Sequence, residues 1–429
     1  MRAWLITVGE PLPTDGPDER LLRTGILANL LASRGHRVVW WTSTFDHMRK
    51  RQRFPQDTVV DRDANLRIVL LHAGAYRQNV SLRRILNHRG VARKFSRLAR
   101  HEPPPDVILC SLPTLELCLA ATAYGRQHGI PVILDIRDLW PDIFLELAPA
   151  WGQGAARALL APMYGMARTA CRDATALVGL TPEFIAWGTR LAGRPRSPLD
   201  RDFAMGYTQA APGPQEQARA EAFWAKQGLC PNSGEFIACF FGTFGRQFDL
   251  ETVIEAARRL QGSGRAFRFV LCGKGDNLEH YRRLAQECGN VLFPGWVGAP
   301  EIWMLMRLAA VGLAPYRNSF NFTANLPNKP IEYLSAGLPI LSSLSEGILK
   351  NLLDAHGGGF TYTDAASLAT ILRDLYDHPE RREACSEQAL ALYRERFIGE
   401  RVYGEMAAYL EELAHPTQAR NEANAAQRT

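Results

Sequence analysis

The chain has 429 residues, which is too many for one ordinary hydrophobic core and suits two domains of about 200 residues each. Apolar residues make up 46% and charged residues 22%, an ordinary composition for a soluble protein, and 50 Lys and Arg against 44 Asp and Glu is a mild basic excess. That excess suits an anionic ligand or surface and does not demand nucleic acid. No run of 18 or more apolar residues occurs, so no membrane span is predicted.

The first apolar run, at 3–8, reaches polar loop residues by position 9, which indicates a first strand and not a signal peptide. Eight cysteines are scattered without a Cys-x-x-Cys pair, and several lie in apolar runs. We predict that they are reduced core residues of a cytoplasmic protein. The polar stretch 415–429 is predicted to be disordered.

Apolar runs of strand length alternate with helical patterns, for example at Leu21–Ser33 and Leu115–Gln127, which predicts parallel sheets built from β-α-β units. The runs form two series, at 3–8, 37–42, 66–71, 106–110, 131–136 and 175–180, and then at 235–241, 267–272, 290–295, 311–315 and 338–343. The Pro- and Gly-rich stretch 191–215 is the predicted interdomain linker. Doubly wound domains bind ligands at the carboxyl ends of their strands, so the predicted site is the cleft between the domains.

Residues 77–100 carry eight Lys or Arg and no acid. Apolar residues recur there at helical spacing, namely Leu82, Ile85, Leu86, Ala92, Phe95 and Leu98. The pattern predicts a basic amphipathic helix with a break near Gly90. Such a helix can lie on an anionic membrane, where each basic residue adds about 1 kcal/mol, or pack on the core with its basic face in water. The first alternative would make the protein peripheral on the inner face of the cytoplasmic membrane.

The strand at 235–241 leads into Gly242 and Gly245 and then into a helical pattern. A glycine turn at a helix N-terminus presents free N–H groups to an anion, most often a phosphate. Arg246 stands in this turn, where its guanidinium could clamp a diphosphate. A tight turn with a surface arginine explains the same pattern.

The strand at 267–272 is followed by Gly273 and Gly275, but Leu278 occupies the place of the third glycine in a dinucleotide fingerprint. The segment is therefore not such a fingerprint. Trp296 follows the next strand, where an aromatic ring beside free backbone amides suits a nucleobase. A core position for Trp296 is the alternative.

The stretch 325–343 predicts a short helix followed by a strand. Asn328 is the predicted N-cap, Pro330 suits the opening turn, and Gly337 suits the left-handed residue that ends the helix. Lys329 could meet a phosphate, and Glu332 could accept two hydrogen bonds from a ribose diol. Otherwise Glu332 is a solvated acid near a helix start.

In chain order, the glycine turn with Arg246, "GKGDN" (273–277), "FPGWV" (293–297), "APY" (314–316) and "NLPNKPIEYLSAGLPI" (325–340) resemble the donor-binding half of the retaining glycosyltransferases of family 4. In the first half, "GHRVVWWTS" (35–43) and "LDIRDLWPD" (134–142) resemble bacterial polysaccharide members close to the WbuB-like branch. The resemblance covers nearly the whole chain.

The resemblance implies the α/β GT-B fold, in which two doubly wound Rossmann-like domains face each other across a cleft. Residues 1–205 would form the acceptor-binding domain and 206–395 the nucleotide-sugar-binding domain. A C-terminal helix at 396–414 would pack back on the first domain, ahead of the tail at 415–429.

The resemblance also implies that Glu332 holds the nucleotide ribose while Arg246 and Lys329 neutralise the diphosphate. The residues implied in donor binding are Gly242, Thr243, Gly245, Arg246, Gly273, Gly275, Trp296, Val297, Asn325, Lys329 and Glu332. Many members have a second Glu eight positions before the first, where this chain has Ala324. Asn321 and Asn325 are the candidates for contacting the sugar instead.

Asp138 follows a buried strand in the first half, at a place where the family often has a His or Asp that orients the sugar or steadies charge at the anomeric carbon. Asp138, Arg246 and Lys329 are the implied catalytic residues. The alternative for Asp138 is helix capping, with Arg137 pairing locally. The loop at 10–25 would close over the diphosphate or the acceptor, or it is an ordinary flexible loop. Its candidate residues are Asp15, Gly16, Thr24 and Gly25.

The implied reaction retains the anomeric configuration, through front-face departure of the nucleotide diphosphate and without a carboxylate nucleophile. No metal and no other cofactor are expected, as is usual for this fold. The implied partners are a nucleotide-diphosphate sugar, of the UDP-N-acetylhexosamine type, and a polyprenyl-linked or growing polysaccharide acceptor of a capsule, O-antigen or exopolysaccharide. Two alternatives stay open: a non-catalytic nucleotide-sugar-binding subunit, because of Ala324, and a UDP-sugar 2-epimerase, which shares the architecture.

Overall fold

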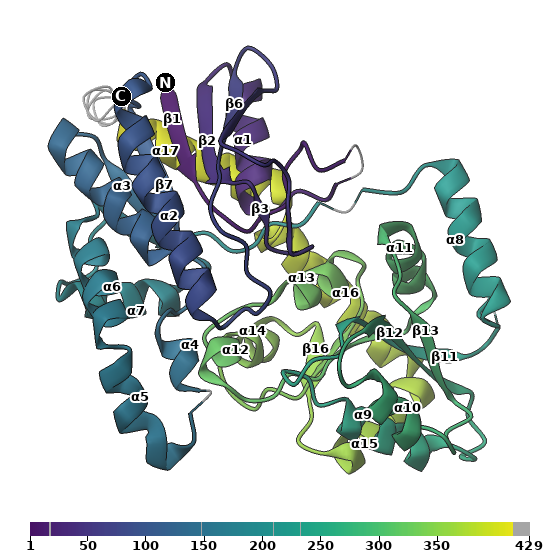
Figure 1. The fold of residues 1–429 in the computed structure, drawn as a ribbon. Coiled ribbons are helices and arrows are strands. Elements are labelled where there is room, and N and C mark those ends of the chain that lie inside the picture. Colours follow the sequence, from purple (N-terminus) through teal and green to yellow (C-terminus); the bar gives the residue numbers. More distant parts are fainter. Residues whose placement is uncertain (17–18, 147, 209, 232, 415–429) are drawn as a thin grey trace, which may run out of the picture. The chain divides into compact units, whose positions relative to one another are not determined.

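The computed structural model describes residues 1–16, 19–146, 148–208, 210–231 and 233–414, so the predicted tail at 415–429 lies outside the described residues. The chain divides into two compact units (Figure 1). The first consists of Met1–Ala204 and the residues from Glu400 onward, and the second of Met205–Gly399.

The first unit contains an eight-stranded sheet in the order β10-β9-β8-β7-β1-β2-β6-β5. Its neighbouring strands are parallel, except that β5 runs antiparallel to β6. Six strands lie where the apolar runs predict them: β1 (Arg2–Ile6), β2 (Arg37–Ser43), β6 (Leu66–Leu71), β7 (Val107–Leu112), β8 (Val132–Ile136) and β9 (Ala176–Gly179). The two edge strands, β5 (Thr58–Asp61) and β10 (Arg201–Asp202), were not predicted.

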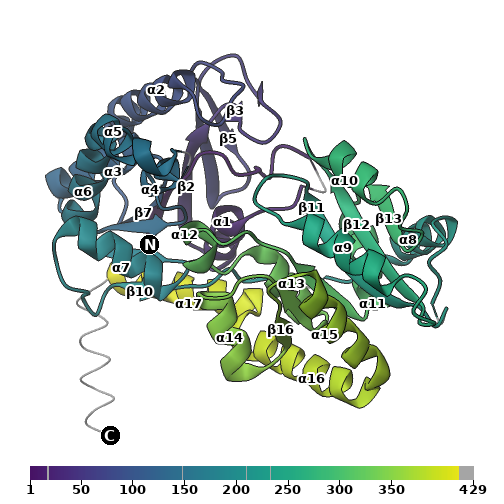
Figure 2. The same cartoon turned by 90° about the horizontal axis from the view of Figure 1, so that it is seen from below.

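Helices cover both faces of this sheet (Figure 2). On one face, Leu5 and Trp40 share a core with α1 (Arg23–Ser33) and α17 (Gly399–Ala414). On the other face, Trp4 and Trp41 contact rings of α2 (Leu82–Leu98) and α3 (Leu115–His128), with the Trp41 and Phe95 centroids 5.1 Å apart. Adjacent residues thus face opposite layers, as the pleat of a strand requires. The unit is completed by β3 (Phe45–Asp46), β4 (Arg51–Gln52), α4 (Asp142–Leu145), α5 (Gln153–Leu159), α6 (Ala161–Asp173), α7 (Pro182–Ala192) and the 3₁₀ turns η1 (Ala99–His101) and η2 (Ala150–Gly152).

The basic helix α2 runs without interruption through Gly90, so the predicted break is wrong. Its C-terminal half is buried against the sheet through Val91 and Phe95. At its N-terminal end, however, Leu82 and Leu86 are 78% and 63% exposed. The core-packing interpretation is therefore right for only half of the helix. No described helix is long and apolar enough to cross a membrane.

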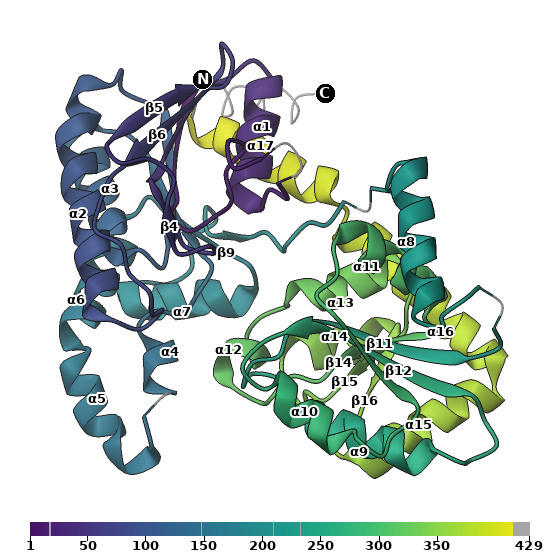
Figure 3. The ribbon, with the colours of Figure 1, turned by 45° about the vertical axis from the view of Figure 1, so that its right-hand side comes forward.

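The second unit contains a six-stranded parallel sheet in the order β13-β12-β11-β14-β15-β16 (Figure 3). Five strands lie where predicted: β11 (Phe236–Thr243), β12 (Phe267–Lys274), β13 (Val291–Gly295), β14 (Val311–Ala314) and β15 (Ile340–Ser342). The short edge strand β16 (Gly359–Thr361) was not predicted. The helices are α8 (Pro214–Lys226), α9 (Leu250–Leu260), α10 (Leu278–Leu284), α11 (Ala299–Leu308), α12 (Phe320–Thr323), α13 (Asn328–Ser335), α14 (Ile348–His356), α15 (Ala365–Asp377) and α16 (Pro379–Arg396).

The division between the units, after Ala204, falls inside the predicted linker at 191–215. The first part of that stretch belongs to the first unit, where the buried Asp200 accepts hydrogen bonds from Arg194 at 2.6 and 2.8 Å. Arg23 donates to the carbonyl oxygens of Phe203 and Ala204 at 2.9 and 3.1 Å. These contacts fix the chain as it leaves the first unit.

All eight cysteines are free thiols, and each except Cys230 is buried, which agrees with the prediction of reduced core residues.

Candidate functional site

The predicted donor-binding residues of the second unit lie at the carboxyl edge of its sheet. Gly242 and Thr243 end β11, directly beside Gly273 and Lys274 at the end of β12. Trp296 follows β13, and the segment from Asn325 to Glu332 follows β14. Because parallel strands end at one edge of a sheet, the fold brings these segments to a common rim.

The glycines at this edge allow two loops to touch. Gly273 has φ +151°, and a Cβ there would lie 1.8 Å from the carbonyl oxygen of Gly242. Gly275 has φ +156°, and its Cβ would lie 2.6 Å from the carbonyl oxygen of Phe244. Since no L side chain fits at such distances, both positions require glycine for backbone packing. The predicted phosphate contacts of these two glycines remain predictions.

Lys329 lies over Gly242. A Cβ on Gly242 would be 2.5 Å from Cε of Lys329 and 2.9 Å from its Nζ. The ammonium also faces aromatic rings, with Nζ 4.8 Å from the ring centre of Phe248 and 5.8 Å from that of Phe240. Burial lowers the pKa of Lys329, and the nearby charge of Glu332 opposes this shift. The predicted cation and the predicted ribose ligand are therefore neighbours.

Glu332 is only 5% exposed, so its interpretation as a solvated acid is wrong. It belongs to α13, which is held on β14 by Tyr333. The Tyr333 ring covers Gly312, where a Cβ would lie 2.4 Å from the ring, and its hydroxyl donates to the carbonyl of Leu313 at 3.2 Å. These contacts fix Glu332 at the sheet edge on a helix of only two turns.

The end of α13 is as predicted, but its start is not. Gly337 has φ +66°, its N–H donates to the carbonyl of Leu334, and the N–H of Leu338 donates to that of Tyr333. This is the Schellman arrangement expected of a C-terminal glycine. Asn328 is not the N-cap, because the extended Pro327 takes that place and makes no side-chain capping bond.

Tyr316, which follows β14, is a site residue that was not singled out in the sequence. Its side chain is 2% exposed, and its hydroxyl has no hydrogen-bond partner among the described residues. Burial, followed by the charge of Glu332, raises its pKa. A buried phenol beside the candidate ribose ligand is thus left with a donor to offer. Only the "APY" motif pointed to this position.

The predicted anion site at the glycine turn with Arg246 lies between β11 and α9. The turn is longer than expected, and Asp249 caps the helix by accepting from the N–H of Thr252 at 3.4 Å. The Asp249 carboxylate accepts from one N–H of this helix N-terminus, and the predicted phosphate contact at the glycine turn stays a prediction. Arg246 is exposed in the turn and has no ion pair among the described residues. Gly245 leaves room for Gln247, whose Oε1 would lie 2.1 Å from a Cβ at that position.

Trp296 is 60% exposed, so the core interpretation of this residue is wrong, whereas its neighbour Val297 is 7% exposed. The Asn325 side chain accepts a hydrogen bond from the N–H of Leu326 at 2.8 Å. In α12, Oδ1 of Asn321 is buried without a partner among the described residues. Of the two candidates for sugar contact, Asn321 therefore has the unused acceptor.

In the first unit, the loop at 10–25 is bound into the fold where it is described. Asp15 pairs with Arg53, whose Nε and Nη2 lie 2.5 and 2.7 Å from its carboxylate oxygens. Thr24 is fully buried and donates to Glu10 through its hydroxyl at 2.8 Å and its N–H at 3.1 Å. Gly25 lies inside α1, where a Cβ would meet the Leu21 side chain at 3.1 Å, while Gly16 faces open space. Thr24 and Gly25 thus make structural contacts, and the predicted closure of the loop over a ligand stays a prediction.

Asp138 lies just past β8 and does not cap a helix, because α4 begins at Asp142 with Pro141 as its N-cap. Arg137 is also not its partner, since its guanidinium binds Asp135 at 2.7 Å and contacts Glu10 and Thr24. Burial raises the pKa of Asp138 to about 6, although the charges of Arg84 and Arg137 oppose the shift. Asp138 is therefore a carboxyl group that titrates near neutral pH.

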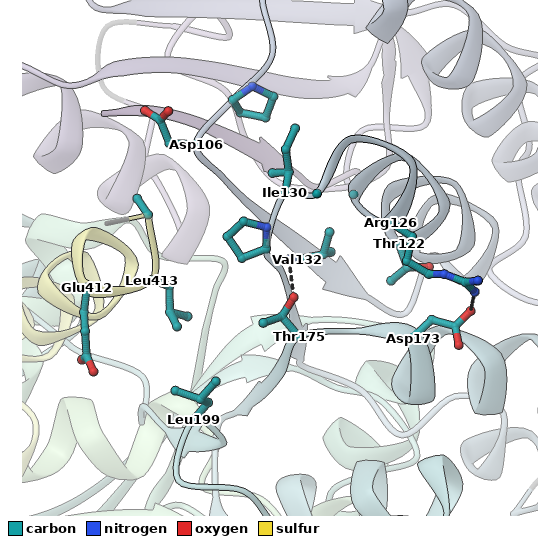
Figure 4. Close-up of a pocket in the computed structure, with 15 residues that line it drawn as sticks. Asp106, Thr122, Arg126, Ile130, Val132, Asp173, Thr175, Leu199, Glu412 and Leu413 are labelled. Atoms are coloured by element: carbon teal, nitrogen blue, oxygen red, sulfur yellow. Dashed lines mark hydrogen bonds and ion pairs between the residues drawn. The ribbon is translucent and has the colours of Figure 1, made fainter. Parts of the chain in front are cut away.

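A cavity of about 1010 Å³ lies at the opposite edge of the first sheet (Figure 4). Its wall includes Pro131, Val132 and Thr175, which lie at the starts of β8 and β9, and Glu412 of α17. Thr175 accepts from the N–H of Val132 at 3.0 Å, and Arg126 binds Asp173 at 2.7 Å. Sites in α/β folds form at carboxyl ends of strands, so we assign no substrate to this cavity.

No group of three or more His, Cys, Asp or Glu suited to a metal ion occurs among the described residues, and metal independence remains a prediction. Two Asp-x-Asp sequences occur, at 61–63 and 200–202. Their described ion pairs are to arginines: Asp61 with Arg67, Asp200 with Arg194, and Asp202 with Arg196.

Two protein families match this chain, one in each half. The family model of the glycosyl transferases group 1 matches residues 225–391, and that of the glycosyl transferase 4-like domain matches 23–200. No curated protein sequence matches the chain significantly.

Several solved structures share the fold over nearly the whole chain. Sucrose-phosphate synthase from Thermosynechococcus elongatus is 17% identical with a TM-score of 0.71, and the match covers 97% of this chain and 100% of that one. Anabaena HepE in complex with UDP-glucose is 13% identical with a TM-score of 0.62, covering 96% and 100%. WaaG, a glycosyltransferase involved in lipopolysaccharide biosynthesis, is 16% identical with a TM-score of 0.60, covering 96% and 99%.

Proposed function

Because the chain is a glycosyltransferase with the GT-B fold, we propose that it moves a hexosyl group from a nucleoside diphosphate to a lipid-linked or growing polysaccharide acceptor, with retention at the anomeric carbon. The donor of this proposal is of the UDP-N-acetylhexosamine type. The observation that carries it is the position of Lys329 within electrostatic reach of the buried Glu332 at the carboxyl edge of the second sheet. The UDP complexes of the structurally similar HepE support a uridine nucleotide.

In this proposal each part of the nucleotide sugar is bound by a particular kind of side chain. The Glu332 carboxylate accepts hydrogen bonds from the ribose diol, and the ammonium of Lys329 meets the diphosphate. Arg246, exposed in its turn, adds a second cation, and the exposed Trp296 ring offers a stacking surface for the base. The Tyr316 hydroxyl is available to a ligand beside Glu332.

The catalytic roles in this proposal follow from the charges that develop in the transition state of sugar transfer. As the glycosidic bond breaks, the diphosphate gains negative charge, so Lys329 and Arg246 stabilise the transition state more than the bound donor. Removing one such donor typically costs about 3–4 kcal/mol, or 100- to 1,000-fold in rate. The departing phosphate oxygen accepts the proton of the acceptor hydroxyl. Asp138 is the carboxyl group that steadies the positive charge at the sugar, in its ionised form above pH 6.

The proposal extends to the biological setting. WaaG acts in lipopolysaccharide biosynthesis, and the "LDIRDLWPD" motif resembles the WbuB-like polysaccharide branch. Both support an acceptor of the capsule, O-antigen or exopolysaccharide class. The basic N-terminal part of α2, with its exposed leucines, supports a protein that works at the inner face of the cytoplasmic membrane.

The test is incubation of the purified chain with a panel of radiolabelled UDP- and GDP-sugars, followed by separation of the products. Transfer to an acceptor, or slow release of free sugar with retained configuration, supports the proposal. Formation of an epimeric nucleotide sugar would indicate a 2-epimerase, and tight donor binding without any turnover would indicate a non-catalytic subunit. Glu332→Gln should lower turnover sharply, whereas Glu287→Gln, a change at an exposed position of the same unit, should not.

A further inference from the structure

An apolar groove of about 450 Å³ lies in the first unit, away from the large cavity of Figure 4. It is bordered by the N-terminal end of α2 and by α4, α5 and α6, which adjoin one another in Figures 1 and 3. Its wall is made mainly of apolar side chains, including Val80, Ile85, Trp140, Phe144, Leu160 and Met163. A groove of this size and character suits an aliphatic chain better than a sugar.

Two cations converge beside this groove. Arg84 lines it, with the guanidinium carbon 4.5 Å from the ring centre of Trp140 and 5.9 Å from that of Tyr76. Lys50 approaches the same Tyr76 ring at 5.1 Å and donates to Asn79 at 2.6 Å. Neither side chain has an ion pair with a carboxylate among the described residues. The groove therefore has a cationic end.

Arg84 retains an unused donor. Its Nη1 donates to the carbonyl of Asn79 at 2.9 Å, but its Nε is buried and has no hydrogen-bond partner among the described residues. A buried N–H without a partner costs free energy, and a bound anion would remove that cost. This unsatisfied atom is the observation that points to a ligand.

The histidines around the two cations do not add charge. Burial lowers the pKa of His47 to about 4, with the charges of Lys50 and Arg84 acting in the same direction. Burial likewise lowers the pKa of His88 to about 3, together with Arg84 and His47. Both imidazoles are neutral at pH 7, so each can donate one hydrogen bond from one ring nitrogen and accept one at the other. Lys50, Arg84, His47 and His88 together thus carry two positive charges, with the carboxyl groups of Asp46 and Asp138 in their surroundings.

The outer rim of the groove is apolar and exposed. Val80 and Leu82, which line the groove, are 58% and 78% exposed, and Leu86, one turn further along α2, is 63% exposed. Leu159 at the end of α5 also lines the groove and is 81% exposed, and Trp151, just before α5, is 91% exposed. Exposed arginines at 83 and 157 lie among these side chains. Such a rim suits the surface of a membrane that carries negative charge.

We propose that this groove and its cationic end bind the acceptor as a lipid-linked phosphate or diphosphate, with the phosphate on Arg84 and Lys50 and the lipid chain along the apolar wall. The inference rests on the proposed function and decides between its two acceptors in favour of the lipid-linked one. Asp138 lies within the electrostatic reach of Arg84, so the anionic end of the ligand sits beside the candidate carboxyl group of the same unit.

The direct test is binding of farnesyl diphosphate, a soluble lipid diphosphate, to the full chain by titration calorimetry. We expect farnesyl diphosphate to bind at least tenfold more tightly than inorganic diphosphate, because the chain fills the apolar wall. Arg84→Gln should weaken this binding about tenfold or more through the lost charged hydrogen bonds. Met163→Glu, which places a charge on the apolar wall, should weaken it by a comparable factor.

Arg93→Gln is the matched control, because Arg93 is exposed on the same helix and does not line the groove. It should change the affinity for farnesyl diphosphate less than twofold. UDP binding, which depends on the second unit, shows whether each variant is folded. Equal affinity for farnesyl diphosphate and inorganic diphosphate would overturn the proposal, as would wild-type affinity in both Arg84→Gln and Met163→Glu.

Vesicles of phosphatidylglycerol separate the acceptor site from simple membrane attachment. If the chain binds vesicles but not farnesyl diphosphate, the exposed rim is only a membrane contact and the acceptor site is refuted. Hydrolysis of UDP-sugars by the wild-type chain is measured in parallel. Its absence would count against the proposed function, whereas the farnesyl diphosphate titration tests the groove whether or not a UDP-sugar is turned over.

Discussion

Replacing Gly242 with alanine should disable Lys329 without unfolding the protein. The added Cβ would lie 2.5 Å from Cε of Lys329, whereas carbon atoms in contact are separated by about 3.5–4.0 Å. The lysine side chain must therefore move by roughly 1 Å or more. Its ammonium is at the end of a flexible side chain, so the movement costs little, and Gly242 lies within the regular strand β11, where alanine introduces no left-handed backbone.

The expected effect on turnover is large. Displacing a positioned group by about 1 Å can reduce a rate by about 100-fold. We therefore expect Gly242→Ala to lower kcat/KM with a UDP-sugar by about 100-fold, while the free energy of unfolding changes by less than about 1 kcal/mol. Lys329→Ala should give a similar loss, and the double variant little more, because both changes remove one interaction.

The assay combines initial rates of UDP-sugar turnover with thermal and chemical denaturation of each variant. Gly289→Ala is the matched control, since a Cβ at Gly289 meets nothing within 4 Å. Gly273→Ala is the contrasting variant, because its Cβ would meet a main-chain oxygen at 1.8 Å and its φ of +151° is strained for alanine. It should lose stability as well as activity. Wild-type turnover in a folded Gly242→Ala protein would refute the role given to Lys329.

Three further predictions follow from the site geometry. Glu332→Gln should raise KM or lower kcat/KM for a UDP-sugar by about tenfold or more, because the amide accepts fewer hydrogen bonds from a diol than a carboxylate, and an unchanged kinetic profile would exclude the ribose contact. Trp296→Ala should weaken UDP binding about tenfold, measured by calorimetry, while the melting temperature stays nearly constant because the side chain is 60% exposed. Asp138→Asn should increase the free energy of unfolding relative to wild type by about 1–3 kcal/mol at pH 8 and by much less at pH 4. The pKa of Asp138 is raised from 3.8 to about 6 on folding, so its proton-linked stability is present at low pH and is lost as the pH rises through that interval. A pH-independent difference between the two proteins in urea denaturation would contradict this reasoning.

The strands were predictable because the sequence repeats one strong signal. Buried parallel strands read as continuous apolar runs, and eleven such runs occur as strands in the described chain. The strands that were missed are two to four residues long: the edge strands β5, β10 and β16, and β3 and β4 of the small two-stranded sheet. Such segments bury few side chains, so their pairing depends on the neighbouring strand and leaves little pattern in the sequence.

The candidate site was predictable in position but not in contacts. Glycines at the ends of β11 and β12 marked the right edge of the sheet, but Gly273 and Gly275 are required there because the two adjacent chain segments approach closely through their backbones. The short helix α13 ended where Gly337 predicted, whereas its N-cap was misplaced by one residue because Asn328 and Pro327 both suit a helix start. Burial of Glu332 and exposure of Trp296 depend on tertiary packing, and no local pattern carries that information.

The arginines of the first unit show how a structural role can be separated from a binding role. Arg137 is surrounded by acceptors, since Asp135, Glu10 and Thr24 all bind its guanidinium, and Arg23 shares Asp135 with it. Burial alone would raise the pKa of Asp135, but the charges of Arg137 and Arg23 lower it below the ordinary value.

A buried set of charges that is complete in this way adds little net stability and mainly fixes geometry. Here it holds the end of β8, just before Asp138, and the chain at Ala204, where it leaves the first unit. Arg84 differs in the decisive respect, because its buried Nε has no partner among the described residues. A buried donor without an acceptor costs free energy, so Arg84, and not Arg137, is the arginine of this unit that we propose to bind a ligand.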